Sequence, residues 1–191
     1  MCLQALAILT MSLMMSHTAS QLIDQANLAR KEQRLADAHR DLTEAIALCR
    51  QAGTRSELVR ALKALGQIDR DRGGHEAARP LYEEAVALCR EEGDPITLAH
   101  TIRHLGDIYR HSGDMTQAEP CYNEALALYR SHKPSPLELA NAIRPLAILK
   151  DAVGEVEVAR GLWEEARDLY EAAKVREGVA ECSARLARLS K

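Results

Sequence analysis

The sequence lacks most features that mark an enzyme or a nucleic-acid-binding protein. It has no Ser–His–Asp or Cys–His arrangement, no glycine-rich phosphate loop and no pair of carboxylates placed for acid–base chemistry. Its net charge is −3, whereas binding to duplex or single-stranded nucleic acid needs a net basic surface. We therefore expect no enzymatic activity and no cofactor, and the charge argues against nucleic acid as the main partner.

Aromatic residues are also scarce. Only 3% of the 191 residues are Phe, Trp or Tyr, and Phe is absent. Ala, Leu, Glu and Arg dominate the composition, and all four are strong helix formers. Because a core of Leu and Ala suits closely packed helices, the composition predicts an all-α protein.

No apolar run is long enough to cross a membrane. The longest extends from Leu3 to Met15, whereas a spanning helix needs about 20 residues. No Lys or Arg precedes this run and no A-x-A cleavage site follows it, although a secretory signal would show both. We predict a cytoplasmic protein in which residues 1–19 form a helix that caps one end of the fold. The alternatives are a signal peptide, which would imply export, and translation from Met11, Met14 or Met15.

The sequence does contain an internal repeat. Four similar stretches begin at residues 41, 81, 121 and 162, so the period is 40 or 41: DLTEAIALCR, LYEEAVALCR, CYNEALALYR and LWEEARDLYE. Three related stretches, which begin at Leu58, Leu98 and Leu139, align upstream of the last three. Such a period predicts a stack of similar supersecondary units in place of one central core.

Each repeat contains two amphipathic helix patterns. Upstream of Gly113, apolar residues recur at spacings of three and four, as on one helix face. A second apolar stripe, from Ala118 to Tyr129, follows the glycine and ends before Pro134 and Pro136, which a helix cannot continue through. The repeat unit is therefore predicted to be a pair of antiparallel helices.

The third unit carries a characteristic set of residues: Leu105, Gly106, Tyr109, Ala118, Tyr122 and Ala125. This set resembles the tetratricopeptide repeat family, and the long period resembles its kinesin-light-chain-type variant. The resemblance implies a right-handed superhelical solenoid of antiparallel helix pairs. Its expected units are about 20–53, 54–93, 94–133 and 134–174, followed by a capping helix at 176–190.

The repeats depart from the family pattern at several positions. Asp69 and Lys150 stand where the third unit has Tyr109, and the first unit has its turn near Gln33 without a glycine. Pro145 lies inside a predicted first helix, where we expect a local kink.

The five cysteines lie far apart and show no CxxC spacing, which argues against a disulfide framework or a zinc site: Cys2, Cys49, Cys89, Cys121 and Cys182. Cys49 and Cys89 occupy the repeat position that holds Tyr129 in the third unit. We interpret them as buried packing residues in the reduced state.

In the family that the sequence resembles, the first helices line a concave groove. The resemblance therefore implies a ligand-binding face that contains Asn27, Arg30, Arg60, Lys63, Gln67, Arg70, His100, Arg103, Asp107, Arg110, Asn141 and Arg144. The repeat period places two basic lines on this face: Lys63, Arg103 and Arg144, and Arg30, Arg70 and Arg110.

Arginine forks bind carboxylates and phosphates, so the two basic lines favour an acidic peptide segment or the carboxyl terminus of a partner as the ligand. The alternatives are a neutral or mixed ligand, and arginines that only pair within their own helix, as Asp107 can with Arg103 or Arg110. His100 and His104 are one turn apart and could bind a metal, but no acidic third ligand can be identified. We expect no metal site.

The sequence thus favours a protein-interaction scaffold or adaptor that binds a peptide in its groove. The alternative is a peptide-sensing regulator or one that forms a homodimer through the apolar N-terminal run. A polyanion or RNA binder is a weaker alternative, because the groove has no aromatic residues for base stacking.

Overall fold

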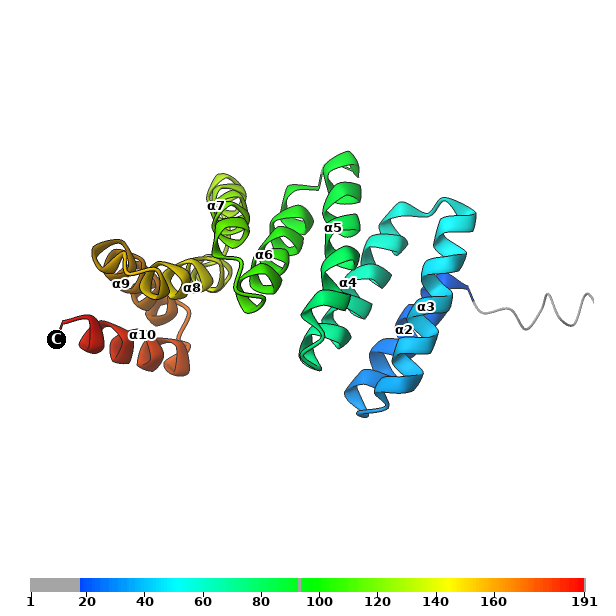
Figure 1. The fold of residues 1–191 in the computed structure, drawn as a ribbon, viewed down its shortest axis with the longest axis horizontal. Coiled ribbons are helices and arrows are strands. Elements are labelled where there is room, and N and C mark those ends of the chain that lie inside the picture. Colours follow the sequence, from blue (N-terminus) through cyan, green and yellow to red (C-terminus); the bar gives the residue numbers. More distant parts are fainter. Residues whose placement is uncertain (1–17, 93, 191) are drawn as a thin grey trace, which may run out of the picture. The chain divides into compact units, whose positions relative to one another are not determined.

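The computed structural model describes residues 18–92 and 94–190. In these residues the protein forms nine helices and no strand, which confirms the predicted all-α class (Figure 1). The helices are α2 (Ala19–Lys31), α3 (Leu35–Ala52), α4 (Arg55–Asp71), α5 (His75–Glu92), α6 (Pro95–His111), α7 (Met115–Ser131), α8 (Pro136–Ala152), α9 (Val156–Ala172) and α10 (Arg176–Leu189). The capping helix predicted at residues 1–19 lies almost wholly outside the described residues.

Short turns join the helices, and glycine accounts for many of them. Four turn glycines have φ values between 72° and 83°, namely Gly53, Gly73, Gly113 and Gly154. Residues with a side chain rarely adopt this left-handed conformation. Gln33 takes the same left-handed conformation with a φ of 61° in the turn after α2. The first repeat therefore makes the same turn as the later ones, as predicted without a glycine.

The protein divides into two compact units, whose boundary falls between Ile68 and Asp69 near the end of α4. Unit 1 contains α2, α3 and most of α4, and it buries Leu22, Ile23 and Leu42 among other side chains. Unit 2 contains the last residues of α4 and helices α5 to α10, and it holds most of the residues of interest below.

The core of unit 2 combines small residues with a few large aromatic ones. One buried cluster joins α7, α8 and α9 through residues such as Tyr122, Ile143 and Trp163, and Trp163 has no exposed surface. A second cluster joins α5 to α6 through residues such as Tyr82 and Ile102. The scarce aromatic residues are thus concentrated at helix contacts.

Gly106 packs closely against one of these aromatic rings, that of Tyr122. A Cβ atom at this position would lie 2.8 Å from Cε1 of Tyr122 and 3.1 Å from Cβ of Cys121. The absent side chain therefore leaves room for the Tyr122 ring of the same repeat, which reaches across to α6. This contact also explains why the glycine and the tyrosine occur together in the repeat.

Two departures from the family pattern are accommodated in α8. The helix runs without interruption from Pro136 to Ala152 through the buried Pro145, and the kink expected there stays a prediction. Lys150, which replaces a tyrosine, is 8% exposed. Its Nζ donates hydrogen bonds to Glu119 at 2.5 Å and to Glu155 at 2.8 Å, so two carboxylates compensate the buried charge.

Ion pairs connect consecutive second helices of unit 2 in a repeating way. Arg90 at the end of α5 contacts Glu124 of α7, with 2.9 Å between Nη2 and Oε2. One repeat later, Arg130 at the end of α7 contacts Glu165 of α9 at 2.8 Å. The two pairs have the same place in their repeats and fix the same relation between neighbouring helices.

None of the four described cysteines forms a disulfide bond. At one repeat position, Cys49 is 0% exposed, Cys89 is 2% exposed and Tyr129 is 1% exposed. These values confirm the packing role predicted for the position. Burial raises the pKa of the Cys121 thiol to about 11, and it does the same for Cys182, so neither forms a thiolate near neutral pH. Among the described helices, none is both long and apolar enough to cross a membrane.

Candidate functional site

The predicted binding residues of unit 2 fall on two neighbouring surfaces. We call Arg70, Arg103, His104, Asp107 and Arg110 the α6 surface, since four of them lie on α6 and Arg70 lies near the end of α4. We call Asn141, Arg144, Asp151, Glu181, Arg185 and Arg188 the α8–α10 surface. Helices α6 and α8 are in contact.

Asp107 is the central carboxylate of the α6 surface. Its Oδ1 accepts a hydrogen bond from the Tyr122 hydroxyl at 2.9 Å. Its Oδ2 lies 3.7 Å from Nη1 of Arg103 and 3.5 Å from Nδ1 of His104. Burial alone would raise the pKa of Asp107, but His104, Arg103 and the Tyr122 hydroxyl outweigh burial and hold that pKa below its usual value.

Two guanidinium groups contact the imidazole ring of His104. Nη1 of Arg70 lies 2.8 Å from Nδ1, and Nη2 of Arg103 lies 3.1 Å from Nε2. Arg70 also contacts Asp71, with 3.3 Å between Nη2 and Oδ1. The side chains of Arg70 and Arg103 are each 18% exposed, and that of His104 is 25% exposed, so all three are largely buried but open to solvent at one edge.

Arg110 completes the α6 surface. Its Nε donates to the Tyr122 hydroxyl at 3.2 Å, and its Nη2 lies 3.0 Å from Nε2 of His111. Neither partner carries a negative charge, and no described carboxylate forms an ion pair with Arg110. The Tyr122 hydroxyl thus links Arg110 to Asp107.

Tyrosines of the second helices hold two other predicted residues in the same manner. The Tyr129 hydroxyl lies 2.7 Å from Nδ1 of His100, and the Tyr170 hydroxyl donates to Oδ1 of Asn141 at 2.9 Å. Both tyrosines stand at the repeat position that Cys49 and Cys89 occupy earlier in the sequence. The change from Cys to Tyr therefore adds a hydroxyl that reaches the first helix.

On the α8–α10 surface, the arginines already have carboxylate partners. Nε and Nη2 of Arg144 donate to the two carboxylate oxygens of Glu181 at 2.7 and 2.9 Å. Asp151 contacts both Arg185 and Arg188, and Arg185 also lies over the ring of Trp163 at 5.6 Å. Arg144 was predicted as a ligand-binding residue, but its charge is compensated within the protein.

The predicted residues of unit 1 form separate contacts. Arg30 donates to the amide oxygen of Gln67 at 2.6 Å, and Arg60 lies 3.4 Å from Asp24. Asn27 and Lys63 are partly exposed. Of the two basic lines, unit 2 contains Arg70 and Arg110 from one line, and Arg103 and Arg144 from the other.

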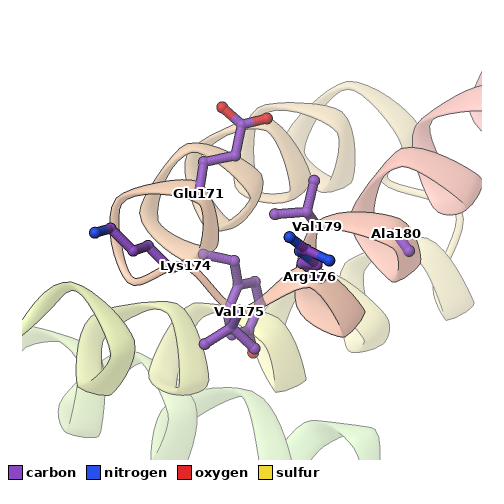
Figure 2. Close-up of a pocket in the computed structure, with 7 residues that line it drawn as sticks. Glu171, Lys174, Val175, Arg176, Val179 and Ala180 are labelled. Atoms are coloured by element: carbon purple, nitrogen blue, oxygen red, sulfur yellow. The ribbon is translucent and has the colours of Figure 1, made fainter.

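A pocket that the sequence did not predict lies at the turn between α9 and α10 (Figure 2). It has a volume of about 490 Å³ and is lined by Tyr170, Glu171, Lys174, Val175, Arg176, Val179 and Ala180. The part of the protein that the structure describes holds no group of three or more His, Cys, Asp or Glu residues that could bind a metal ion.

Comparison with known proteins identifies the family. A sequence profile described as the tetratricopeptide repeat matches residues 17–91 and 97–172, which is most of the sequence. The chain belongs to the tetratricopeptide repeat family. No curated protein matches it significantly.

Solved structures share the fold of this tetratricopeptide repeat protein at low sequence identity. The apo form of RapI has a TM-score of 0.80 at 14% identity over 86% of this chain. A signal-transduction ATPase with a tetratricopeptide repeat sensor from Pyrococcus horikoshii has a TM-score of 0.80 at 17% identity over 88% of this chain. The chain spans only 46% of the length of RapI and 26% of that of the ATPase.

Another similar structure contains the repeats of a putative kinesin light chain from Podospora anserina, with a TM-score of 0.69 at 15% identity. The match covers 92% of the present protein and 97% of that one. At such identities the three likenesses establish the fold alone.

The sequence reasoning did not identify the tyrosine hydroxyls or Glu181 as parts of this tetratricopeptide repeat surface. The sequence did contain a signal for the tyrosines. The pair of Gly106 and Tyr122 has a counterpart in the second repeat, and Tyr129 replaces a cysteine of earlier repeats. No repeat signal pointed to Glu181, because its partner Arg144 lies 37 residues away on a different helix.

Proposed function

We propose that this tetratricopeptide repeat protein is a non-catalytic scaffold that binds an acidic peptide segment of a partner protein on its α6 surface. The tetratricopeptide repeat fold is typically non-catalytic and serves protein interaction, which supports the general role. The acidic character of the ligand is the more specific part of the proposal.

One observation carries that specific part. Three arginines gather on the α6 surface, and of the carboxylates in the described residues only Asp107 and the exposed Asp71 contact them. On the neighbouring α8–α10 surface, Arg144 is fully engaged by Glu181. Acidic side chains of a ligand would therefore find available guanidinium groups on α6 and would be attracted there by its charge.

Binding of short fluorescent peptides to the full-length protein tests this proposal. Acidic peptides are expected to bind more tightly than neutral or basic peptides of the same length. The variant Arg110→Glu should weaken acidic-peptide binding about tenfold, since it removes a charged donor and adds repulsion. Arg176→Glu is a matched control, because it makes the same charge change at an exposed side chain of α10.

Equal binding of acidic and neutral peptides would overturn the proposal. The same conclusion would follow if Arg110→Glu and Arg176→Glu weakened binding equally, because the loss would then reflect net charge and not the α6 surface. Fluorescence anisotropy measured at two salt concentrations separates an effect of net charge from a contact on the α6 surface, since screening removes most long-range attraction.

A peptide-sensing regulator is a second candidate, supported by the described role of the similar repeats in the Pyrococcus horikoshii protein as a sensor. It would require a change in assembly when peptide binds, which light scattering with and without peptide measures. Self-association through Leu3–Met15 stays a prediction, because that run lies outside the described residues.

A further inference from the structure

The ring of His104 is surrounded by more hydrogen-bond donors than it can satisfy. Arginine nitrogens only donate, and a neutral imidazole has one accepting and one donating nitrogen. Arg70 and Arg103 nevertheless approach the two different ring nitrogens at 2.8 and 3.1 Å. For either neutral tautomer, one guanidinium N–H faces an imidazole N–H, and for the protonated ring both do.

Nearby acceptors do not resolve this conflict. Oδ1 of Asp107 is engaged by Tyr122, and Oδ2 stays at 3.5 Å from His104 and 3.7 Å from Arg103. Asp71 takes one contact from Arg70 but is itself half exposed. Among the described residues, one guanidinium N–H therefore meets no acceptor at the imidazole ring, although Arg103 also has the Tyr129 hydroxyl as a partner.

We propose that Arg70, Arg103 and His104 form a subsite for a single oxyanion group, a carboxylate or a phosphate. The inference rests on the proposed function and specifies where the ligand's charge is held. An oxygen pair would accept from both guanidinium groups, whose planar forks match carboxylate and phosphate geometry. Because the three side chains are largely buried, these hydrogen bonds would be stronger than at an open surface.

Occupation of the subsite has a consequence at His104. Charged and titratable groups contact this ring from three helices: Arg70 of α4, Tyr82 of α5, and Arg103 and Asp107 of α6. Asp71 contacts Arg70, and the Tyr122 hydroxyl of α7 links Asp107 to Arg110, which in turn contacts His111. In the free protein, burial lowers the pKa of His104, and the charges of Arg103 and Arg70 add to this effect against the opposing influence of Asp107. A bound anion stabilises the imidazolium, so binding should take up a proton at this ring.

A nuclear magnetic resonance titration of the His104 ring in the full-length protein tests the subsite. The signal is assigned with His104→Gln, and acetate, inorganic phosphate and chloride are compared at matched ionic strength. We expect a saturable shift with acetate or phosphate, together with a rise of about one unit or more in the pKa of His104. Chloride should leave the signal nearly unchanged.

Variants decide whether the named arginines hold the anion. Arg70→Gln and Arg103→Gln should each abolish the saturable shift, whereas Arg176→Gln, which changes the net charge equally, should keep it. Circular dichroism of each variant verifies that it is folded. The anion that binds more tightly is also tested with Arg103→Lys, which retains the positive charge without the forked guanidinium geometry. A partial response from Arg103→Lys would support the forked geometry.

The subsite is overturned if the shift does not saturate, if chloride reproduces it, or if it persists in both arginine-to-glutamine variants. Saturation by phosphate without acetate would support the subsite but assign it to a phosphorylated ligand, which contradicts the acidic residues of the proposed function. Acidic-peptide binding without any response at His104 would retain the proposed function and overturn the subsite.

Discussion

The α6 surface and the α8–α10 surface of unit 2 carry arginines at equivalent repeat positions, but only on the α8–α10 surface does this arginine donate two hydrogen bonds to a carboxylate. Arg103 and Arg144 are 41 residues apart and occupy the same place in consecutive first helices. Arg144 meets both oxygens of Glu181, whereas Arg103 meets a histidine and a carboxylate oxygen 3.7 Å away. The same residue type at the same repeat position is thus a structural link in the fourth repeat and an available donor in the third.

The source of the difference is the last helix. α10 contributes Glu181 to Arg144, and it contributes Arg185 and Arg188 to Asp151 of α8. Such pairing compensates the charges of both helices where the described repeats end. Arg103 has no such partner on the following first helix, because the position of α8 that is equivalent to Glu181 is Asn141.

The largest expected effect separates the two surfaces by stability. Asp107→Asn should lower the free energy of unfolding by about 2–3 kcal/mol, because Arg103 and His104 would lose the carboxylate that compensates them in a largely buried position. Glu181→Gln should cost less than about 1 kcal/mol, because the Arg144 side chain is 41% exposed and water can replace the pair. Urea denaturation followed by circular dichroism measures both. Equal losses would show that the two surfaces do not differ in this way.

A smaller effect is expected where α6 contacts Tyr122. Gly106→Ala should destabilise the protein by about 1–3 kcal/mol, because the new methyl group would overlap the Tyr122 ring. Gly161→Ala is the matched control, since α9 leaves open space there and alanine favours a helix by about 1 kcal/mol. Opposite changes in the urea midpoint are expected. If Gly106→Ala were also stabilising, the ring would not limit the residue at this position.

The smallest effect is a dependence of stability on pH. Burial lowers the pKa of His104 in the folded state from its value of 6.5 in the unfolded state. Below pH 6.5 the unfolded state therefore binds a proton at this ring more readily than the folded state does. The free energy of unfolding should therefore fall as the pH drops below about 6.5. The lowered pKa of Asp107 adds a second loss below 3.8.

Urea titrations at several pH values in wild type and His104→Gln isolate the contribution of this ring. The variant should lose less stability between neutral pH and about pH 5 than wild type. Glu181→Gln should keep the wild-type dependence, because it leaves the His104 environment intact. Parallel curves for wild type and His104→Gln would contradict the assignment.

The sequence was sufficient to predict the helices and the repeat fold. Apolar spacing of three and four residues and the turn glycines specify helix pairs locally, and a fixed period transfers that result from one repeat to the next. The partners of individual side chains could not be obtained in this way. Arg144 and Glu181 are 37 residues apart, and Tyr122 and Asp107 are 15 apart, so these contacts depend on side-chain reach across helices.

The conflict at His104 was beyond sequence reasoning for a related reason. Neither His104 nor Arg70 is unusual at its position on a polar helix face. Only the distances of 2.8 and 3.1 Å from two guanidinium groups to one ring reveal the shortage of acceptors. The sequence indicates a basic surface, but which of its charges are available to a ligand depends on the contacts between the folded side chains.

The ion pairs between successive second helices also bear on how such a protein can change in length. The third repeat carries an acceptor in the middle of its second helix, Glu124, and a donor at the end of the same helix, Arg130, whereas the fourth repeat has Glu171 at the donor position. A tandem duplication of this third repeat would give the new copy an ion-pair partner on both sides without any further substitution. The gene could therefore gain or lose copies of this repeat by unequal crossing-over while the ion pairs on either side of it stay matched.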